Sequence, residues 1–116
     1  MPQTILSNAF SLGMVNPSPS GLTLKVRPIT LEEVKDLLRE GFVSAVGHQA
    51  TAEVLSLLLG TEIPFNRTSI SLSQGDRLIV FQIRTRLEEG RVLNKEEVDA
   101  LYQQGLTSFY LVEVLS

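Results

Sequence analysis

His48 is the single histidine of this 116-residue chain, and imidazole is the side chain that most readily exchanges protons near neutral pH. It lies in the segment AVGHQAT, residues 45–51, between a short apolar segment and an apolar helix that the sequence predicts. Strand-to-helix connections of this kind are frequent ligand sites in α/β sheets, and the first amides of a helix are free to bind an anion. An imidazolium there could protonate a departing alkoxide beside a phosphate.

The alternative for His48 is a helix-terminal residue whose ring nitrogens are satisfied within the protein. Gly47, just before it, would in either case permit a close approach of other groups to the backbone. The segment has no neighbouring carboxylate, which argues against the His–Asp pair that a serine hydrolase needs. The catalytic role left for His48 is that of a proton donor near a phosphate, beside the alternative of a satisfied helix-terminal residue, which is the usual outcome for a lone histidine.

A second polar group lies on the strand predicted over residues 77–86. Under the two-residue period of a strand, one of its faces begins with the apolar residues Leu78 and Val80. The same face ends with Gln82, Arg84 and Arg86. A solvated strand end would give this pattern, and so would a site at which guanidinium groups bind phosphate oxygens.

Three charged residues outside that strand favour the phosphate site. Arg67 begins a predicted strand over residues 66–73, Glu89 lies in the turn LEEG, and Arg91 follows it. A hairpin turn predicted at Gln74–Gly75 would place Arg67 near the end of the longer strand. Arg67, Gln82, Arg84 and Arg86 would then lie together at one edge of the sheet.

Asn8 and Ser11, in the segment SNAFS, form a third polar group at the end of the first predicted strand. Their side chains could bind a ribose, a phosphate or a base. Asn and Ser are also common wherever a strand ends in a turn, so this segment is not specific by itself.

Composition limits the function classes. Lys and Arg total 10 against 13 Asp and Glu, so the net charge of −3 disfavours a general nucleic-acid coat protein. One histidine and no cysteine make a transition-metal site improbable and exclude disulfides, and no cofactor is expected. No apolar run has the roughly 18 residues that a membrane span needs, and the first residues do not resemble a signal peptide. We expect one cytoplasmic domain over residues 1–116.

The elements that must position these residues follow from periodicity and from turn residues. Strands are predicted over residues 3–10, 22–29, 42–46, 66–73, 77–86 and 107–114. Helices are predicted over residues 30–41, 51–60 and 94–105, with capping boxes at Thr30–Glu33 and Asn94–Glu97. Strands and helices alternate only in part, which favours an α/β fold with a mixed sheet and helices mainly on one face.

Several segments, taken in order, resemble one known family, the viral anti-CRISPR ring nucleases and their bacterial relatives. The segments are LSNAFSLGM, AVGHQAT, LLGTEIPFNR and QIRTRLEEGRVLNKEEVDALYQQGLTSFYLVEV. They extend over nearly the whole chain, with a less distinct match between Pro17 and Arg39. Ring nucleases of this family degrade cyclic tetra-adenylate, the second messenger of type III CRISPR defence.

The resemblance implies roles for residues that match the family's pattern. His48 matches the catalytic histidine, before a threonine, and Arg86 and Glu89 match an active-site arginine and acid. The matched ligand-contacting positions are Asn8, Ser11, Arg67 and Gln82. Arg84 has no secure counterpart and receives no role. Gln49 and Ala50 replace the commoner Asp-Ser after the histidine, which puts in doubt only how that loop is braced.

The resemblance also implies a five-stranded mixed sheet, a homodimer with the ligand at its interface, and metal-independent chemistry. A ribose 2′-hydroxyl would attack its phosphorus while His48 protonates the 5′-oxygen. Two such cuts would release linear di-adenylate with 2′,3′-cyclic phosphate ends.

Two non-enzymatic alternatives remain from the sequence. A dimeric protein of this kind could bind duplex DNA, although the net charge of −3 counts against strong phosphate neutralisation. It could also bind the cyclic messenger without cutting it.

Overall fold

The computed structural model describes residues 3–15, 19–85 and 93–115. Five strands form one mixed sheet: β1 (Thr4–Ser7), β2 (Leu24–Ile29), β3 (Val43–Ala45), β4 (Arg77–Ile83) and β5 (Thr107–Val114). The helices are α1 (Leu31–Arg39), α2 (Gln49–Leu59), α3 (Lys95–Gln103) and the short 3-10 helix η1 (Leu12–Met14). The mixed sheet that the sequence pattern predicted, with the five strands that the resemblance implied, is confirmed.

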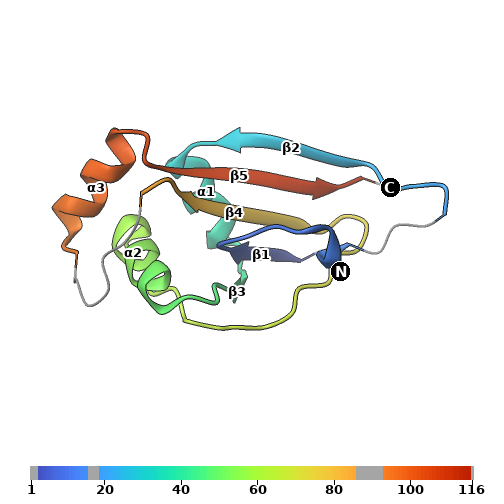
Figure 1. Cartoon of the computed structure of the whole chain (residues 1–116), viewed down its shortest axis with the longest axis horizontal. Coiled ribbons are helices and arrows are strands. Elements are labelled where there is room, and N and C mark those ends of the chain that lie inside the picture. The colour runs from blue at the N-terminus through green and yellow to red at the C-terminus, as the bar shows by residue number, and fades with distance from the viewer. Residues whose placement is uncertain (1–2, 16–18, 86–92, 116) are drawn as a thin grey trace.

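The strands lie in the order β2-β5-β4-β1-β3 (Figure 1). β1 is parallel to both of its neighbours, β3 and β4, whereas β5 is antiparallel to β2 and β4. Four strands therefore run in one direction and β5 runs in the other. As a result, the carboxyl ends of β1, β3 and β4 meet at the same edge of the sheet.

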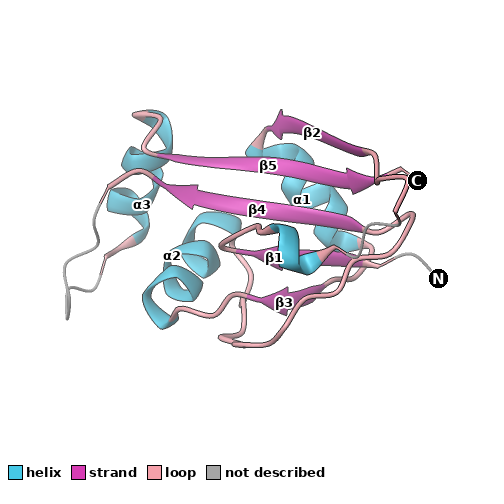
Figure 2. Cartoon of the chain, turned by 45° about the vertical axis from the view of Figure 1, so that its right-hand side comes forward, coloured by secondary structure: helices cyan, strands magenta, loops and turns pink. Residues whose placement is uncertain are grey.

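All three α-helices pack on one face of the sheet (Figure 2). Val34 of α1, Leu55 of α2 and Val98 of α3 are fully buried, in one cluster with Ile79 and Phe81 of β4. Phe81 packs against a phenylalanine of β5, with ring centroids 5.0 Å apart. The predicted placement of the helices is thus confirmed. In the part of the chain that the structure describes, no helix is long and apolar enough to cross a membrane.

The opposite face of the sheet is only partly covered. Leu78 and Val80 of β4 are buried there by Val15 and Leu72, which belong to two loops joined by a parallel bridge. This cover does not reach the β2 edge of the sheet, where Val26 is 58% exposed. The sheet therefore has one face closed by helices and another that stays open toward β2.

Side-chain caps begin two of the helices as predicted. Thr30 and Glu33 form a capping box at α1, and Asn94 and Glu97 form another at α3. Glu33 also accepts a hydrogen bond from Arg27 of β2 at 3.1 Å. This bond is the largest cause that lowers the pKa of Glu33 below its ordinary value. The associated stabilisation is present at neutral pH and is lost as the pH falls through that lowered pKa.

The predicted strand over residues 66–73 is wrong, and so is the hairpin at Gln74–Gly75. This segment runs as a loop because both sides of β4 are already occupied, by β1 and by β5. The alternation in its sequence has another cause. Ile70 and Leu72 pack on the open face of the sheet, while the alternating residues Ser69, Ser71 and Ser73 are exposed.

Other element boundaries differ by a few residues. The first strand is β1, Thr4–Ser7, which is shorter than predicted, and β4 ends at Ile83. Pro28 does not end its strand but pairs with a β5 residue inside β2. An edge strand accommodates proline because one side of it needs no ladder hydrogen bond. The helix after His48 begins directly at Gln49.

Asp76 fixes the other end of the sheet. Its carboxylate is 5% exposed and accepts hydrogen bonds from the backbone amides of Gln3 at 3.0 Å and Ser73 at 2.8 Å. It thereby joins the start of β1 to the turn that enters β4.

We predict that Asp76→Ala lowers the free energy of unfolding by about 3 kcal/mol, because two amide donors lose their acceptor. Urea unfolding followed by circular dichroism measures this change. Asp36→Ala is the control, since Asp36 forms only an exposed ion pair within α1 and its removal should cost less than about 0.5 kcal/mol. Equal destabilisation by the two variants would contradict the role of Asp76.

Candidate functional site

The carboxyl edge of the three parallel strands collects residues that are far apart in the sequence. Ser7 of β1 pairs with Ala45 of β3 on one side and with Val80 of β4 on the other. Asn8 follows β1, and Gly47 with His48 follows β3. Gln82 lies two residues beyond Val80 on β4. Ligand sites in α/β sheets usually form at such an edge.

Asn8 connects two of these segments directly. Its side-chain oxygen accepts a hydrogen bond from the backbone amide of Gly47 at 3.2 Å. The end of β1 therefore holds the connection that carries His48. Asn8 thus has a structural partner in the protein, and its side-chain NH2 group is the part left for a ligand.

Arg67 reaches this edge along a loop that follows β3. The amide of Asn66 donates to the carbonyl of Val46 at 2.8 Å, and its side-chain nitrogen donates to the carbonyl of Ser44 at 2.7 Å. Arg67 consequently lies against Gly47, where a Cβ atom would stand 3.2 Å from its Cγ. The missing side chain at Gly47 is what allows the arginine to pack against the backbone of the residue that precedes His48.

His48 is the N-cap residue of α2 and is exposed. Its side chain makes no capping hydrogen bond to the helix backbone. Nδ1 of the imidazole instead lies 3.3 Å from the hydroxyl oxygen of Thr51, one turn into the helix. The ring is therefore held from one side by α2 while its other side faces solvent.

Gln82 contributes to a hollow of about 520 Å³ on the open face of the sheet. The hollow is lined by Asn8, Ala9, Phe10, Val26, Val80, Gln82, Tyr110 and Val112. It combines an apolar floor with two side-chain amides at one end. Such a lining suits a base or a sugar as well as an apolar side chain.

Two further residues flank this hollow. Ser11 is exposed and precedes η1, next to Phe10 in the chain. Arg84 follows β4 and donates a hydrogen bond to the hydroxyl of Tyr110 at 3.3 Å. Arg84, which received no role from the sequence, thus lies beside a residue that lines the hollow.

The structure brings together Asn8, His48 and Arg67 around Gly47, and Asn8 with Gln82 at the hollow. The predicted hairpin does not bring Arg67 to the edge; the loop along β3 does. Arg86 and Glu89, predicted as catalytic, and Arg91 lie outside the described residues.

Sequence reasoning missed three residues that shape this region. Thr51 contacts the imidazole, Asn66 fixes the arginine loop, and Tyr110 lines the hollow. Thr51 is three residues after His48, but the sequence prediction began the helix at Thr51 and not at Gln49, so it did not indicate that His48 is the N-cap or that the two side chains lie one turn apart. Nothing in the sequence signals that Asn66 reaches β3, because that contact depends on the path of the loop.

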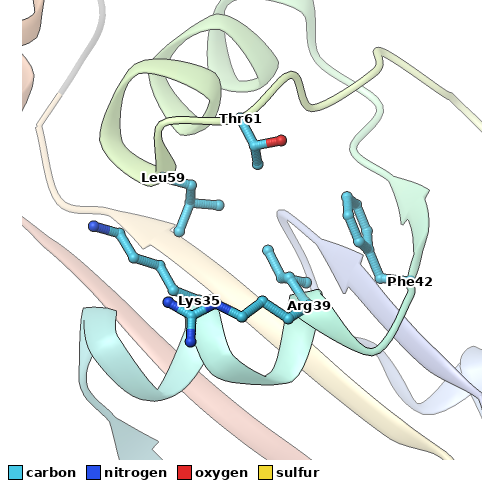
Figure 3. Close-up of a pocket in the computed structure, with 6 residues that line it drawn as sticks. Lys35, Arg39, Phe42, Leu59 and Thr61 are labelled. Atoms are coloured by element: carbon cyan, nitrogen blue, oxygen red, sulfur yellow. The ribbon is translucent and has the colours of Figure 1, made fainter.

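The described residues offer no cluster of metal ligands, but they form a second hollow. Residues 3–15, 19–85 and 93–115 contain no group of three or more His, Cys, Asp or Glu placed to hold a metal ion. A smaller hollow of about 230 Å³ lies between α1 and the end of α2 (Figure 3). It is lined by Lys35, Leu38, Arg39, Phe42, Leu59 and Thr61. Because α2 has 11 residues, its two ends are roughly 16 Å apart, and this hollow is separate from His48.

Together, the fold and this edge define a small α/β protein with a polar site at the ends of parallel strands. The STIV B116-like family model matches residues 4–109, and the chain belongs to that family. It is similar to the solved structure of B116 of Sulfolobus turreted icosahedral virus, with a TM-score of 0.84 and 33% sequence identity. That similarity covers 96% of this chain and 98% of B116.

Relatives occur in viruses and in a bacterium. The chain is 44% identical over 94 residues to uncharacterised protein 26 of Sulfolobus islandicus filamentous virus, which is 80% of this chain and 77% of the relative. It is 37% identical over 94 residues to uncharacterised protein ORF117 of Acidianus two-tailed virus, 78% of each chain. Protein YddF of Bacillus subtilis, also uncharacterised, is 33% identical over 108 residues, 90% of this chain and 94% of YddF.

We predict that Asn8→Ala raises the hydrogen-exchange rate of the Gly47 amide about fivefold, which corresponds to the loss of one hydrogen bond of about 1 kcal/mol. Nuclear magnetic resonance measures this exchange for individual amides. Asn8→Asp retains an acceptor oxygen and should keep the slow rate. If the alanine variant also kept it, β1 would not hold the His48 connection through this bond.

Proposed function

We propose that this protein is a metal-independent ring nuclease that cuts cyclic tetra-adenylate into linear di-adenylate with 2′,3′-cyclic phosphate ends. The observation that carries the proposal is that His48 is exposed at the carboxyl edge of the sheet and that Arg67 lies against Gly47, the residue before it. The ring-nuclease resemblance of the sequence supplies the substrate. The messenger is made inside cells, so we expect the protein to act in the cytoplasm.

The proposed chemistry uses a proton donor and positive charge. The ribose 2′-hydroxyl loses its proton to water and its oxygen attacks the adjacent phosphorus. The bond from phosphorus to the 5′-oxygen breaks as the new bond forms, and His48 gives a proton to that oxygen. Arg67, which has no ion-pair partner among the described residues, is available to bind the phosphate.

The remaining roles follow the resemblance. Arg86 would stabilise phosphate charge and Glu89 would orient His48 or an arginine, both from the segment that the structure does not describe. Asn8, Ser11 and Gln82 would bind the ring of nucleotides around the scissile bond. Holding the 2′-oxygen in line with the phosphorus would supply much of the remaining rate acceleration.

We also propose that the protein acts as a homodimer with the ligand at its interface. A ring with four phosphates has twofold symmetry and can meet two copies of one site. The open face of the sheet supports this assembly, because Val26 is 58% exposed and Leu12 of η1 is 77% exposed. The hollow that Asn8 and Gln82 line is on the same face. A second copy covering this face would bury that apolar surface and bring two sites together.

For the assembly, we predict that Val26→Asp converts a dimer into a monomer, because it places a charge in the apolar interface. Light scattering after size-exclusion chromatography measures the mass in solution. Lys25→Asp is the matched control, since Lys25 is exposed on the same strand but points to the other face. A wild-type monomer, or a dimer that Val26→Asp leaves intact, would contradict this interface.

For the chemistry, we predict that His48→Ala lowers the cleavage rate of cyclic tetra-adenylate roughly 10²- to 10⁴-fold, because the leaving oxygen loses its proton donor. Binding of the ring should persist, since the phosphate-binding groups remain. Single-turnover cleavage and equilibrium binding measure the two effects separately.

Arginine variants provide matched controls in the same assays. Arg67→Ala should weaken binding, whereas Arg39→Ala, which removes an arginine at the separate hollow, should not. Unchanged turnover in His48→Ala would show that the proton donor is misassigned. Binding of the ring by the wild-type protein without cleavage would instead favour a protein that only sequesters the messenger, and salt-sensitive duplex binding would favour a DNA-binding protein.

A further inference from the structure

Thr51 and His48, whose side chains are in contact, both lie at the start of α2. His48 is the N-cap of α2 and Thr51 is its third residue, so the two side chains lie one turn apart on the same side. The hydroxyl oxygen of Thr51 is 3.3 Å from Nδ1 of the imidazole. Thr51 is 8% exposed, whereas His48 is exposed.

Burial makes Thr51 a stiff partner. A β-branched side chain in a helix has few allowed rotamers, and enclosure by the core restricts it further. The hydroxyl of a helical threonine often bonds to a backbone carbonyl of the preceding turn. Here the recorded partner is the ring of His48 instead. The threonine therefore directs its polar atom to the N-cap side chain.

The hydroxyl can serve the imidazole in both of its protonation states. It can donate to Nδ1 of the neutral ring, and it can accept from the Nδ1–H of the cation. In either state Nδ1 stays on the side of the helix. Nε2 is then the nitrogen that faces solvent and that a ligand would meet.

We propose that Thr51 is a positioning residue that holds Nδ1 of His48 and leaves Nε2 to exchange the proton with a ligand. The consequence for catalysis rests on the proposed function, whereas the orientation of the ring does not. If Thr51 were purely structural, its methyl group would contribute to stability by packing in the core. Its hydroxyl would then need a hydrogen-bond partner only because it is buried, and the orientation of the His48 ring would not depend on it.

Two substitutions separate these roles because each keeps one half of the side chain. Thr51→Val keeps the shape and removes the hydroxyl, and Thr51→Ser keeps the hydroxyl and removes the methyl group. If the hydroxyl positions the ring, the serine variant retains the behaviour of the wild type and the valine variant loses it. If packing alone matters, the order is reversed.

The ring itself provides a readout that needs no activity, because the chain has one histidine and its nitrogen signals are unambiguous. In ¹⁵N nuclear magnetic resonance of the full chain near pH 8, we expect the neutral ring to carry its proton on Nε2 in the wild type and in Thr51→Ser. In Thr51→Val we expect a measurable increase of the tautomer protonated on Nδ1. Nitrogen signals that are the same in the wild type and in Thr51→Val would overturn the proposal.

Cleavage of cyclic tetra-adenylate provides the second readout. We expect Thr51→Val to lower kcat roughly ten- to a hundredfold through misplacement of the ring. KM should stay within about twofold, because the phosphate-binding groups are unchanged. Full activity in Thr51→Val, or a loss in Thr51→Ser as large as that in Thr51→Val, would overturn the catalytic part.

The two proposals fail in distinguishable ways. A wild-type protein that does not cut the ring contradicts the proposed nuclease, while the nitrogen signals still decide whether Thr51 positions His48.

Discussion

The parallel pairing of β1 with both β3 and β4 is the constraint on which the rest of the structure depends. Because these three strands run in the same direction, their carboxyl ends meet at one edge, and β1 is buried between the other two. A reversal of any one of them would carry its end residue to the opposite edge of the sheet. Asn8 meets both Gly47 and the hollow that Gln82 lines only because of this arrangement.

Side-chain polar contacts help to hold the loops at that edge. Asn8 holds the Gly47 amide, Asn66 holds the carbonyls of β3, and Thr51 contacts the ring of His48. Side-chain hydrogen bonds of this kind restrict the conformation of a polar loop and leave the loop exposed to solvent. They can therefore keep His48 and Arg67 close together and still exposed to a ligand.

The sequence predicts the sheet well where hydrophobic periodicity is set by burial. Val34 and Leu38 follow the helical period because α1 covers the sheet, and the capping boxes mark two helix starts to the residue. Residues 66–73 show how the same logic fails. Their alternation reflects Ile70 and Leu72 packing on a sheet face, which periodicity alone does not distinguish from strand pairing. Val26 is a second example of this failure. The alternation of apolar residues in β2 indicates that Val26 is buried, but it is 58% exposed in the single chain.

The sequence named candidate site residues, but it did not indicate the contacts that bring some of them together. His48 and Arg67 were singled out by residue type and by resemblance, whereas the position of the loop that carries Arg67 depends on contacts made by Asn66 and on the small size of Gly47. Such contacts link residues that are distant in the sequence, so no local pattern signals them. The family and its fold follow from the comparisons, whereas the nuclease activity is a proposal that rests on residue chemistry and on the sequence resemblance.

The most direct measurement is the incubation of the purified protein with cyclic tetra-adenylate in the presence of EDTA, followed by mass analysis of the products. The account predicts linear di-adenylate with 2′,3′-cyclic phosphate and 5′-hydroxyl ends. An intact ring, or cleavage that appears only after magnesium is restored, would contradict it.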